Sequence, residues 1–186
     1  NHNLLRKGVI HIMKIICSKS NLLKSVSIAL KAVPSKTTMP ILECILMDAT
    51  TNQIKFTTND MELGIETIVE GTIEEKGKVA LDAKIFYEII RRLPDNDVTI
   101  KTDDKYAATI TCEKAKFNIP GKSGEDFAYL PMIEKDEPLT ISQYTLKEMI
   151  RQTIFSIAVN ENNKLMTGEL FEIKNNCLKV VSLDGH

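Results

Sequence analysis

The sequence lacks the features that mark several common classes of protein. Its four cysteines lie far apart and include no Cys-x-x-Cys pair, so a zinc site is not expected. The eight glycines are scattered rather than gathered into a phosphate-binding loop. There is no Gly-x-Ser-x-Gly elbow, and no apolar run approaches the ~20 residues of a membrane span. These absences argue against several enzyme classes and against a membrane protein.

The placement of cysteine and histidine predicts a reducing compartment and no bound metal. The four cysteines, Cys17, Cys44, Cys112 and Cys177, are expected to be buried free thiols, because three of the four sit in strand-like alternation. The three histidines lie near the two ends of the chain, at positions 2, 11 and 186. We therefore expect a cytoplasmic protein without a cofactor.

Residues 1–12 do not have the composition of a secretory signal. They carry Arg6 and Lys7 but lack a long apolar region and a small-residue cleavage site. Met13 followed by Lys14 resembles a natural start, so we expect residues 1–12 to be a leader or tag outside the fold.

Net charge is −1, which is unlike a strongly basic nucleic-acid binder, but the charge is unevenly distributed. Three candidate helices, at residues 21–32, 84–93 and 145–158, have charges of +2, +2 and +1. The rest of the chain therefore carries −6. Positive charge is predicted on the helices and negative charge on the strands and loops.

A unit of strand, short polar turn and amphipathic helix recurs about every 62 residues. The copies begin at residues 14, 78 and 139, and superposing Val26, Ile89 and Ile150 gives spacings of 63 and 61. Protein architectures of this kind work through overall shape rather than through a single catalytic pocket.

Alternating apolar and polar residues between the copies predict half-buried antiparallel strands. These segments are residues 41–48, 53–58, 63–70, 97–102, 107–113, 116–119, 168–173 and 177–182. Pro40 is expected to exclude helix just before the first of them. Each repeat unit then reads strand–helix–strand–strand–strand, and the fold class is α+β.

The repeat predicts two domains. Two units form a first domain at residues 13–130, and residues 131–138 form an acidic linker bounded by prolines. Residues 139–186 hold one unit and the beginning of another, which is a truncated second domain. Such a half-domain is expected to have an open edge and an uncovered apolar surface, which favour aggregation or swapping.

Two short constellations allow a catalytic interpretation beside a structural one. Asp60 and Glu62 are two residues apart and could chelate a metal weakly, but a turn with solvated carboxylates is the preferred interpretation. Asp184 and His186 could form a catalytic pair, but a strand-end turn with Gly185 at positive φ is preferred. We therefore predict no catalytic and no metal-binding residues.

Nine short strings, taken together and in order, carry a family resemblance. They are Leu22-Leu23-Lys24, Thr38-Met39-Pro40-Ile41-Leu42, Thr58-Asn59-Asp60-Met61-Glu62, Lys84-Ile85-Phe86, Arg91-Arg92-Leu93-Pro94, Phe117-Asn118-Ile119, Phe155-Ser156-Ile157-Ala158, Gly168-Glu169-Leu170-Phe171-Glu172 and Leu183-Asp184-Gly185-His186. From Met13 to His186 the chain resembles the bacterial sliding clamp, the beta subunit of DNA polymerase III.

This resemblance implies a DNA clamp fold in which antiparallel sheets lie outside and helices line a DNA channel. The implied function is that of a processivity factor, not an enzyme. In that family two chains form a homodimeric ring around duplex DNA and tether the polymerase III catalytic subunit, the clamp loader and other proteins with clamp-binding motifs.

The resemblance also implies roles for individual residues. DNA contacts are expected from Lys36, Lys84, Asn160, Asn163, Lys164 and Leu165. A pocket for partner peptides is expected at Met166, Leu183, Gly185 and His186. A ring interface is expected at Lys114, Lys116, Phe117 and Ile119.

Two other functions stay open at this point. One is a peptide-binding scaffold that does not contact DNA. The other is a metal-dependent hydrolase with its site at Asp60 and Glu62.

Overall fold

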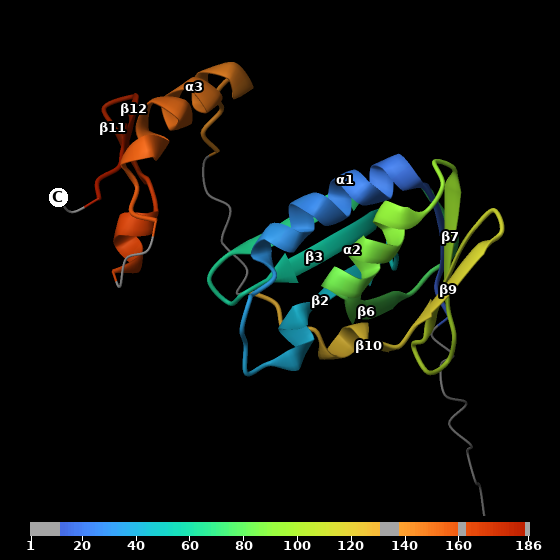
Figure 1. The fold of residues 1–186 in the computed structure, drawn as a ribbon. Helices are drawn as coiled ribbons and strands as arrows, with labels where there is room; N and C mark the ends of the chain where they lie inside the picture. Colours follow the sequence, from blue (N-terminus) through green and yellow to red (C-terminus); the bar gives the residue numbers. More distant parts are fainter. Residues whose placement is uncertain (1–11, 131–137, 160–162, 185–186) are drawn as a thin grey trace, which may run out of the picture. The chain divides into compact units, whose positions relative to one another are not determined.

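The computed structural model describes residues 12–130, 138–159 and 163–184 of the chain (Figure 1). The chain forms two compact units, residues 1–132 and 133–186, and each is considered by itself. The expected domain limits of 13–130, 131–138 and 139–186 fall partly outside the described residues, so they stay a prediction. No described helix is long and apolar enough to cross a membrane.

The first unit contains the same series of elements twice. The first half consists of β1 (Lys14–Ser18), α1 (Lys19–Ala29), η1 (Leu30–Ala32), η2 (Pro40–Glu43), β2 (Cys44–Asp48), β3 (Ile54–Asn59), β4 (Gly64–Val69) and β5 (Thr72–Glu75). The second half consists of β6 (Lys78–Asp82), α2 (Ala83–Arg92), β7 (Asp97–Thr102), β8 (Ala108–Cys112), β9 (Ala115–Ile119), β10 (Gly121–Ser123) and η3 (Gly124–Asp126). The duplicated α+β unit is confirmed, and each copy gains a short final strand, β5 or β10, that the alternation did not predict.

The two halves exchange their first strands. One sheet has the order β5-β1-β7-β8-β9 and the other has the order β10-β6-β2-β3-β4. All pairs in the two sheets are antiparallel. Strand β1 therefore completes the sheet of the second half, and β6 completes the sheet of the first half. Neither half can form its sheet alone.

The core lies where the two helices meet both sheets. Helices α1 and α2 lie side by side against the strands (Figure 1). Each helix buries one face. Helix α1 buries Leu22, Val26 and Ala29, and helix α2 buries Phe86 and Ile90, with Leu93 just after its last residue. The ring of Phe86 meets that of Phe56 edge to face, with centroids 6.1 Å apart.

Each half has an ion pair between its first strand and its last elements. The Lys14 ammonium lies 2.5 Å from the Glu74 carboxylate, and the Lys78 ammonium lies 2.8 Å from that of Glu125. Each hydrogen bond raises the pKa of its lysine. Both lysines open the first strand of their half, so each ion pair ties that strand to the end of the same half.

Helix caps give the true spacing of the repeat. The Asn21 N–H donates to the Ser18 hydroxyl at 3.2 Å, and the Ile85 N–H donates to the Asp82 carboxylate at 2.8 Å. The caps are therefore 64 residues apart, and at that spacing the buried Val26 matches the buried Ile90. The sequence-based superposition of Val26 on Ile89 was wrong by one residue.

Other boundaries also differ from the expectation. Pro40 does not exclude helix, because it is the first residue of η2, where its missing N–H is not needed. Strand β2 consequently begins at Cys44 instead of residue 41. The first helix starts at Lys19, two residues earlier than expected, and ends as the 3-10 turn η1.

The second unit has a helix followed by a hairpin. Its elements are α3 (Gln143–Thr153), η4 (Ile154–Ser156), η5 (Lys164–Thr167), β11 (Leu170–Lys174) and β12 (Cys177–Val181). Among the described residues, strands β11 and β12 pair only with each other. Helix α3 keeps the N-cap of the repeat, because the Thr145 N–H donates to the Ser142 hydroxyl at 3.0 Å.

The strand expected at the start of this unit, residues 139–142, does not form. In the first unit the equivalent strand, β1, is held by β7 of the other half, whereas residues 138–142 have no neighbouring strand in the described part of the chain. Without such a layer no residue of 138–159 or 163–184 is fully buried. Phe155, Val159 and Leu165 are 81%, 88% and 85% exposed, which agrees with the expected uncovered apolar surface.

Three of the four cysteines are buried and one is exposed. Cys17, Cys44 and Cys112 are buried free thiols as expected, but Cys177 on β12 is exposed, because nothing in the described part of its unit covers the hairpin. Desolvation by burial raises the pKa of Cys17 to about 12.

Titration of the native protein with Ellman's reagent should therefore modify one thiol quickly, at Cys177. The other three should react only after unfolding in denaturant, because buried thiols with raised pKa values provide almost no thiolate at neutral pH. A Cys177→Ser variant serves as the control and should lose the fast phase. Two or more fast thiols in the wild type would contradict this burial pattern.

Candidate assembly edge and nucleic-acid face

A shallow groove of about 300 Å³ lies between α2 and β9. The residues that line it are Lys84, Ile85, Glu88, Ile89, Arg92 and Phe117. Ile85 is 51% exposed and Phe117 is 37% exposed, so the groove has an apolar centre with charged residues around it. Apolar surface of this kind on a folded module is typical of a place where another protein packs.

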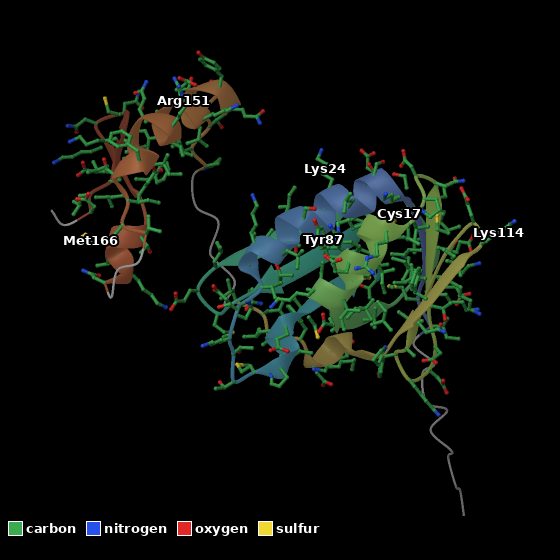
Figure 2. The ribbon with its side chains drawn as sticks, viewed as in Figure 1. Cys17, Lys24, Tyr87, Lys114, Arg151 and Met166 are labelled. Atoms are coloured by element: carbon green, nitrogen blue, oxygen red, sulfur yellow. The ribbon has the colours of Figure 1, made fainter. Side chains whose placement is uncertain are left out.

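Strand β9 adds an open sheet edge to this groove. It is the last strand of its sheet and pairs only with β8. Such an edge presents backbone N–H and C=O groups to which another strand can pair. Lys116 and Phe117 are exposed on β9, and Lys114 lies at the tip of the β8–β9 hairpin (Figure 2).

The expected interface residues do not all present side chains at this edge. Ile119 is only 2% exposed and belongs to the hydrophobic core, so it supports β9 from beneath. Lys84, expected to contact DNA, lines the same groove as Phe117.

Charge at the groove is mostly positive. The Glu88 carboxylate lies 2.7 Å from the Arg91 guanidinium and 3.5 Å from that of Arg92. The hydrogen bond to Glu88 raises the pKa of Arg91. Glu88 offsets only one of these two cations, and Lys84 is a further positive charge in the lining of the groove.

The outer faces of the helices carry the other cations. Lys24 on α1 (Figure 2) and Lys31 in η1 are exposed. Arg91 and Arg92 are exposed at the end of α2. Lys36 lies exposed in the connection between η1 and η2.

In the second unit the candidate DNA residues gather in one 3-10 turn. The Asn163 side chain caps η5 by accepting from the Leu165 N–H at 3.1 Å. Lys164 and Leu165 belong to that turn, and Leu165 is almost fully exposed. Asn160 lies outside the described residues.

The candidate peptide-pocket residues come from two segments. Met166 is half-buried in η5, and its carbonyl accepts from the Ala158 N–H at 2.8 Å. Leu183 follows β12 and is 50% exposed. Gly185 and His186 lie outside the described residues.

The Asp60 carboxylate stabilises a turn. Its carboxylate accepts from the N–H groups of Glu62 at 2.9 Å and Leu63 at 2.7 Å, which closes the turn before β4. Met61 in this turn has φ 76°. Asp60 and Glu62 therefore occupy a turn and not one face of a strand, and the described residues contain no group of three potential metal ligands.

The described residues of the first unit thus form a duplicated α+β module with strands at the sheet edges and exposed cations on its helices. Residues 13–131 match the family described as DNA polymerase III beta subunit, N-terminal domain. The chain therefore belongs to the DNA polymerase III beta subunit family, as the sequence resemblance indicated.

Individual relatives agree with this membership. Beta sliding clamps of Synechocystis sp. (strain ATCC 27184 / PCC 6803 / Kazusa) and Bacillus subtilis (strain 168) are 34% and 35% identical to the chain over 182 residues. Those alignments cover 94% of this chain but only 46% and 48% of the relatives. The chain thus spans about half the length of the curated relatives it matches.

Solved structures give the same picture. A DNA polymerase III beta subunit from Eubacterium rectale ATCC 33656 matches with a TM-score of 0.86 and 70% identity, covering 94% of this chain and 48% of that one. The sliding clamp from Bacillus subtilis matches with a TM-score of 0.85 and 34% identity, covering 95% and 48%. Membership of this family agrees with the expectation that the chain is not an enzyme.

Sequence reasoning did not single out Ile85 and Ile89. They are four residues apart and line the groove on α2, beside the core residues Phe86 and Ile90. Ile85 is 51% exposed, whereas Ile89 is half-buried and also packs against the core.

Neighbouring substitutions test this register. We expect Ile89→Asp to lower the free energy of unfolding by about 1–2 kcal/mol, because Ile89 is half-buried beside the groove and a carboxylate there keeps part of its hydration. Ile90→Asp should cost about 4 kcal/mol or more, because the charge would be buried. Urea unfolding followed by far-ultraviolet circular dichroism measures both, and equal losses would refute the assignment.

Proposed function

We propose that the chain contributes the first domain and part of the second to a ring-shaped sliding clamp. The clamp is a non-enzymatic processivity factor that encircles duplex DNA and tethers the polymerase. The observation that carries the proposal is the pairing of exposed cations on two adjacent helices with an open, apolar sheet edge in a member of this family.

The helix cations supply the interaction with DNA. Protein–DNA affinity rises with the number of phosphates neutralised, and contacts to phosphate carry no sequence information. A few exposed lysines and arginines on α1, η1 and α2, with Lys36 nearby, suit weak contact with any duplex. Weak contact permits sliding, while enclosure by the ring provides the long residence time.

The α2/β9 edge supplies ring closure. It offers a strand for pairing, an apolar centre at Ile85, Ile89 and Phe117, and a positive rim at Lys114 and Lys116. A face with an apolar centre and an acidic rim is its complement. In the homodimer that face is provided by the other chain.

The second unit supplies further contacts. The η5 turn, with Asn163, Lys164 and Leu165, lies on the DNA path together with Asn160. Met166 and Leu183, with Gly185 and His186, form part of the pocket for short motifs of the polymerase III catalytic subunit, the clamp loader and other partners. The assembly works on DNA in the bacterial cytoplasm.

A chimera tests enclosure: this chain replaces the matching 48% of the Eubacterium rectale protein. Once loaded, the chimera should remain on nicked circular DNA and leave linear DNA through its ends. Equal retention on the two forms would exclude enclosure, and absence of any DNA association would favour a peptide-binding scaffold.

Charge reversal in the same chimera tests the DNA face. We expect Lys36→Glu to lower loading or retention by roughly tenfold at low salt, with the difference shrinking as salt rises. Lys105→Glu, the same change on the β7–β8 turn, is the matched control and should behave as the parent. Equal effects of the two variants would remove Lys36 from the DNA path.

Ring closure is tested by Phe117→Asp in the chimera. A carboxylate in the apolar groove is costly to cover, so dimerisation should weaken at least about tenfold by sedimentation velocity. Asn118→Asp, which adds the same charge to the next residue of β9, should have a smaller effect. Dimers that resist Phe117→Asp would show that this edge does not close the ring.

A further inference from the structure

The first unit contains a second, smaller apolar cluster. Its members come from η2, β2, β6 and the residue after η3: Ile41, Cys44, Leu46, Ala80 and Phe127. The neighbours of Leu46 on β2, which are Ile45 and Met47, belong to the main core. Because successive side chains of a strand point to opposite faces, the small cluster lies on the other face of this sheet. Phe127 is 4% exposed there, so the chain packs on the sheet again after η3.

Residues 127–130, the exit segment, lead from η3 toward the end of the first unit. The rings of Phe127 and Tyr129 meet edge to face, with centroids 5.6 Å apart. Leu130 lies close to Gly64 of β4, where an added Cβ atom would come within 2.7 Å of Leu130 Cδ1. The exit segment therefore passes directly beside the start of β4.

A buried amide binds the exit segment from the neighbouring strand. Asn59 is the last residue of β3 and is 1% exposed. Its Nδ2 donates to the Ala128 carbonyl at 2.7 Å, and its Oδ1 accepts from the Met61 N–H at 3.2 Å. Both ends of the side-chain amide are thus used, as the burial of such a group requires.

This contact is the described hydrogen bond that joins the exit segment to a strand. The Phe127 N–H donates to the Gly124 carbonyl at 3.4 Å, but that bond stays within the turn formed by η3. Apolar packing at Phe127 is not directional, whereas the Asn59 bond fixes the position of one peptide group. Ala128 is therefore held at the end of β3.

We infer that Asn59 is a positioning residue that holds the exit segment on the first unit at Ala128. The rest of the chain then starts from a fixed point beside β3 and β4, and a short tether allows fewer directions than a long one. In a ring of repeated domains this favours closure, because errors of direction add up around the ring. The inference goes beyond the proposed function, since it holds whether or not DNA is encircled.

The variant Asn59→Asp tests the inference in this chain. It keeps an oxygen that accepts from the Met61 N–H, but it places a carboxylate oxygen against the Ala128 carbonyl. Thermolysin cleavage before Phe127, divided by cleavage before the buried Ile100 of the other sheet, measures local release of the exit segment. At about pH 8 this ratio should rise at least about tenfold over wild type, because the segment opens without global unfolding.

The pH dependence separates this hydrogen bond from a general packing role. Burial raises the pKa of a carboxyl group, so lowering the pH to about 5.5 should protonate the introduced group, which can then donate to the Ala128 carbonyl. With rates normalised to those of the unfolded chain at each pH, the ratio should fall toward the wild-type value as the pH decreases. Asn59→Ala has no donor at either pH and should keep a raised ratio at both.

Two controls accompany these variants. Asn118→Asp makes the same chemical change at an exposed position of β9 and should leave the ratio as in wild type at both pH values. Val26→Ala removes buried volume from α1, so it lowers global stability and should speed both cleavages in parallel, with no change in their ratio.

Three outcomes would overturn the inference: an unchanged ratio for Asn59→Asp at pH 8, a raised ratio that does not fall with the pH, or equal responses of Asn59→Asp and Asn118→Asp. Should Asn59→Asp lose its native circular dichroism at pH 8, Asn59→Ala decides. Its ratio should be raised, and a ratio equal to that of wild type would again overturn the inference. These measurements involve no DNA, so they stand apart from the tests of clamp function.

Discussion

The antiparallel pairing of β1 with β7, and of β6 with β2, is the interaction on which the rest of the first unit depends. Because each half lends its first strand to the other, neither half has a sheet or a core of its own. The two helices pack side by side in one layer, and the Phe86 ring of one half contacts the Phe56 ring of the other. The second unit shows the converse. It has the capped helix α3 and a hairpin, but in its described residues nothing pairs with residues 138–142 and no side chain is fully buried.

Strand exchange also determines where assembly can occur. It places β9 and β4 at the ends of the two sheets, each beside the helix that its own half contributes. The groove between α2 and β9 has an apolar centre at Ile85, Ile89 and Phe117. The groove between α1 and β4 is mixed, because the exposed Ile28 and Ile68 line it together with polar side chains such as Asn21.

The proposed clamp function depends on charge and shape and not on a reactive group. It requires no nucleophile, metal or cofactor; it requires positive charge on one layer and edges that hold the ring together. Lys24, Arg91 and Arg92 are exposed on adjacent helices, where they can attract phosphates without reading bases. Lys84, expected among the DNA residues, is exposed at the start of α2 and also lines the groove between α2 and β9.

Local sequence was enough to predict the repeat, the three helices, most strands and the α+β class, because caps such as Ser18 and alternation such as that of β7 act within a few residues. Family resemblance added the expected site residues. Tertiary structure alone decided which stripe of α2 is buried, so that Ile90 enters the core while Ile89 lines a groove. It also decided that β5 and β10 form strands whereas residues 139–142 do not. Likewise it left Cys177 exposed and Cys17 buried. The physical reason is the same in each case: a strand or an apolar side chain acquires its state only from a neighbour that is distant in the sequence.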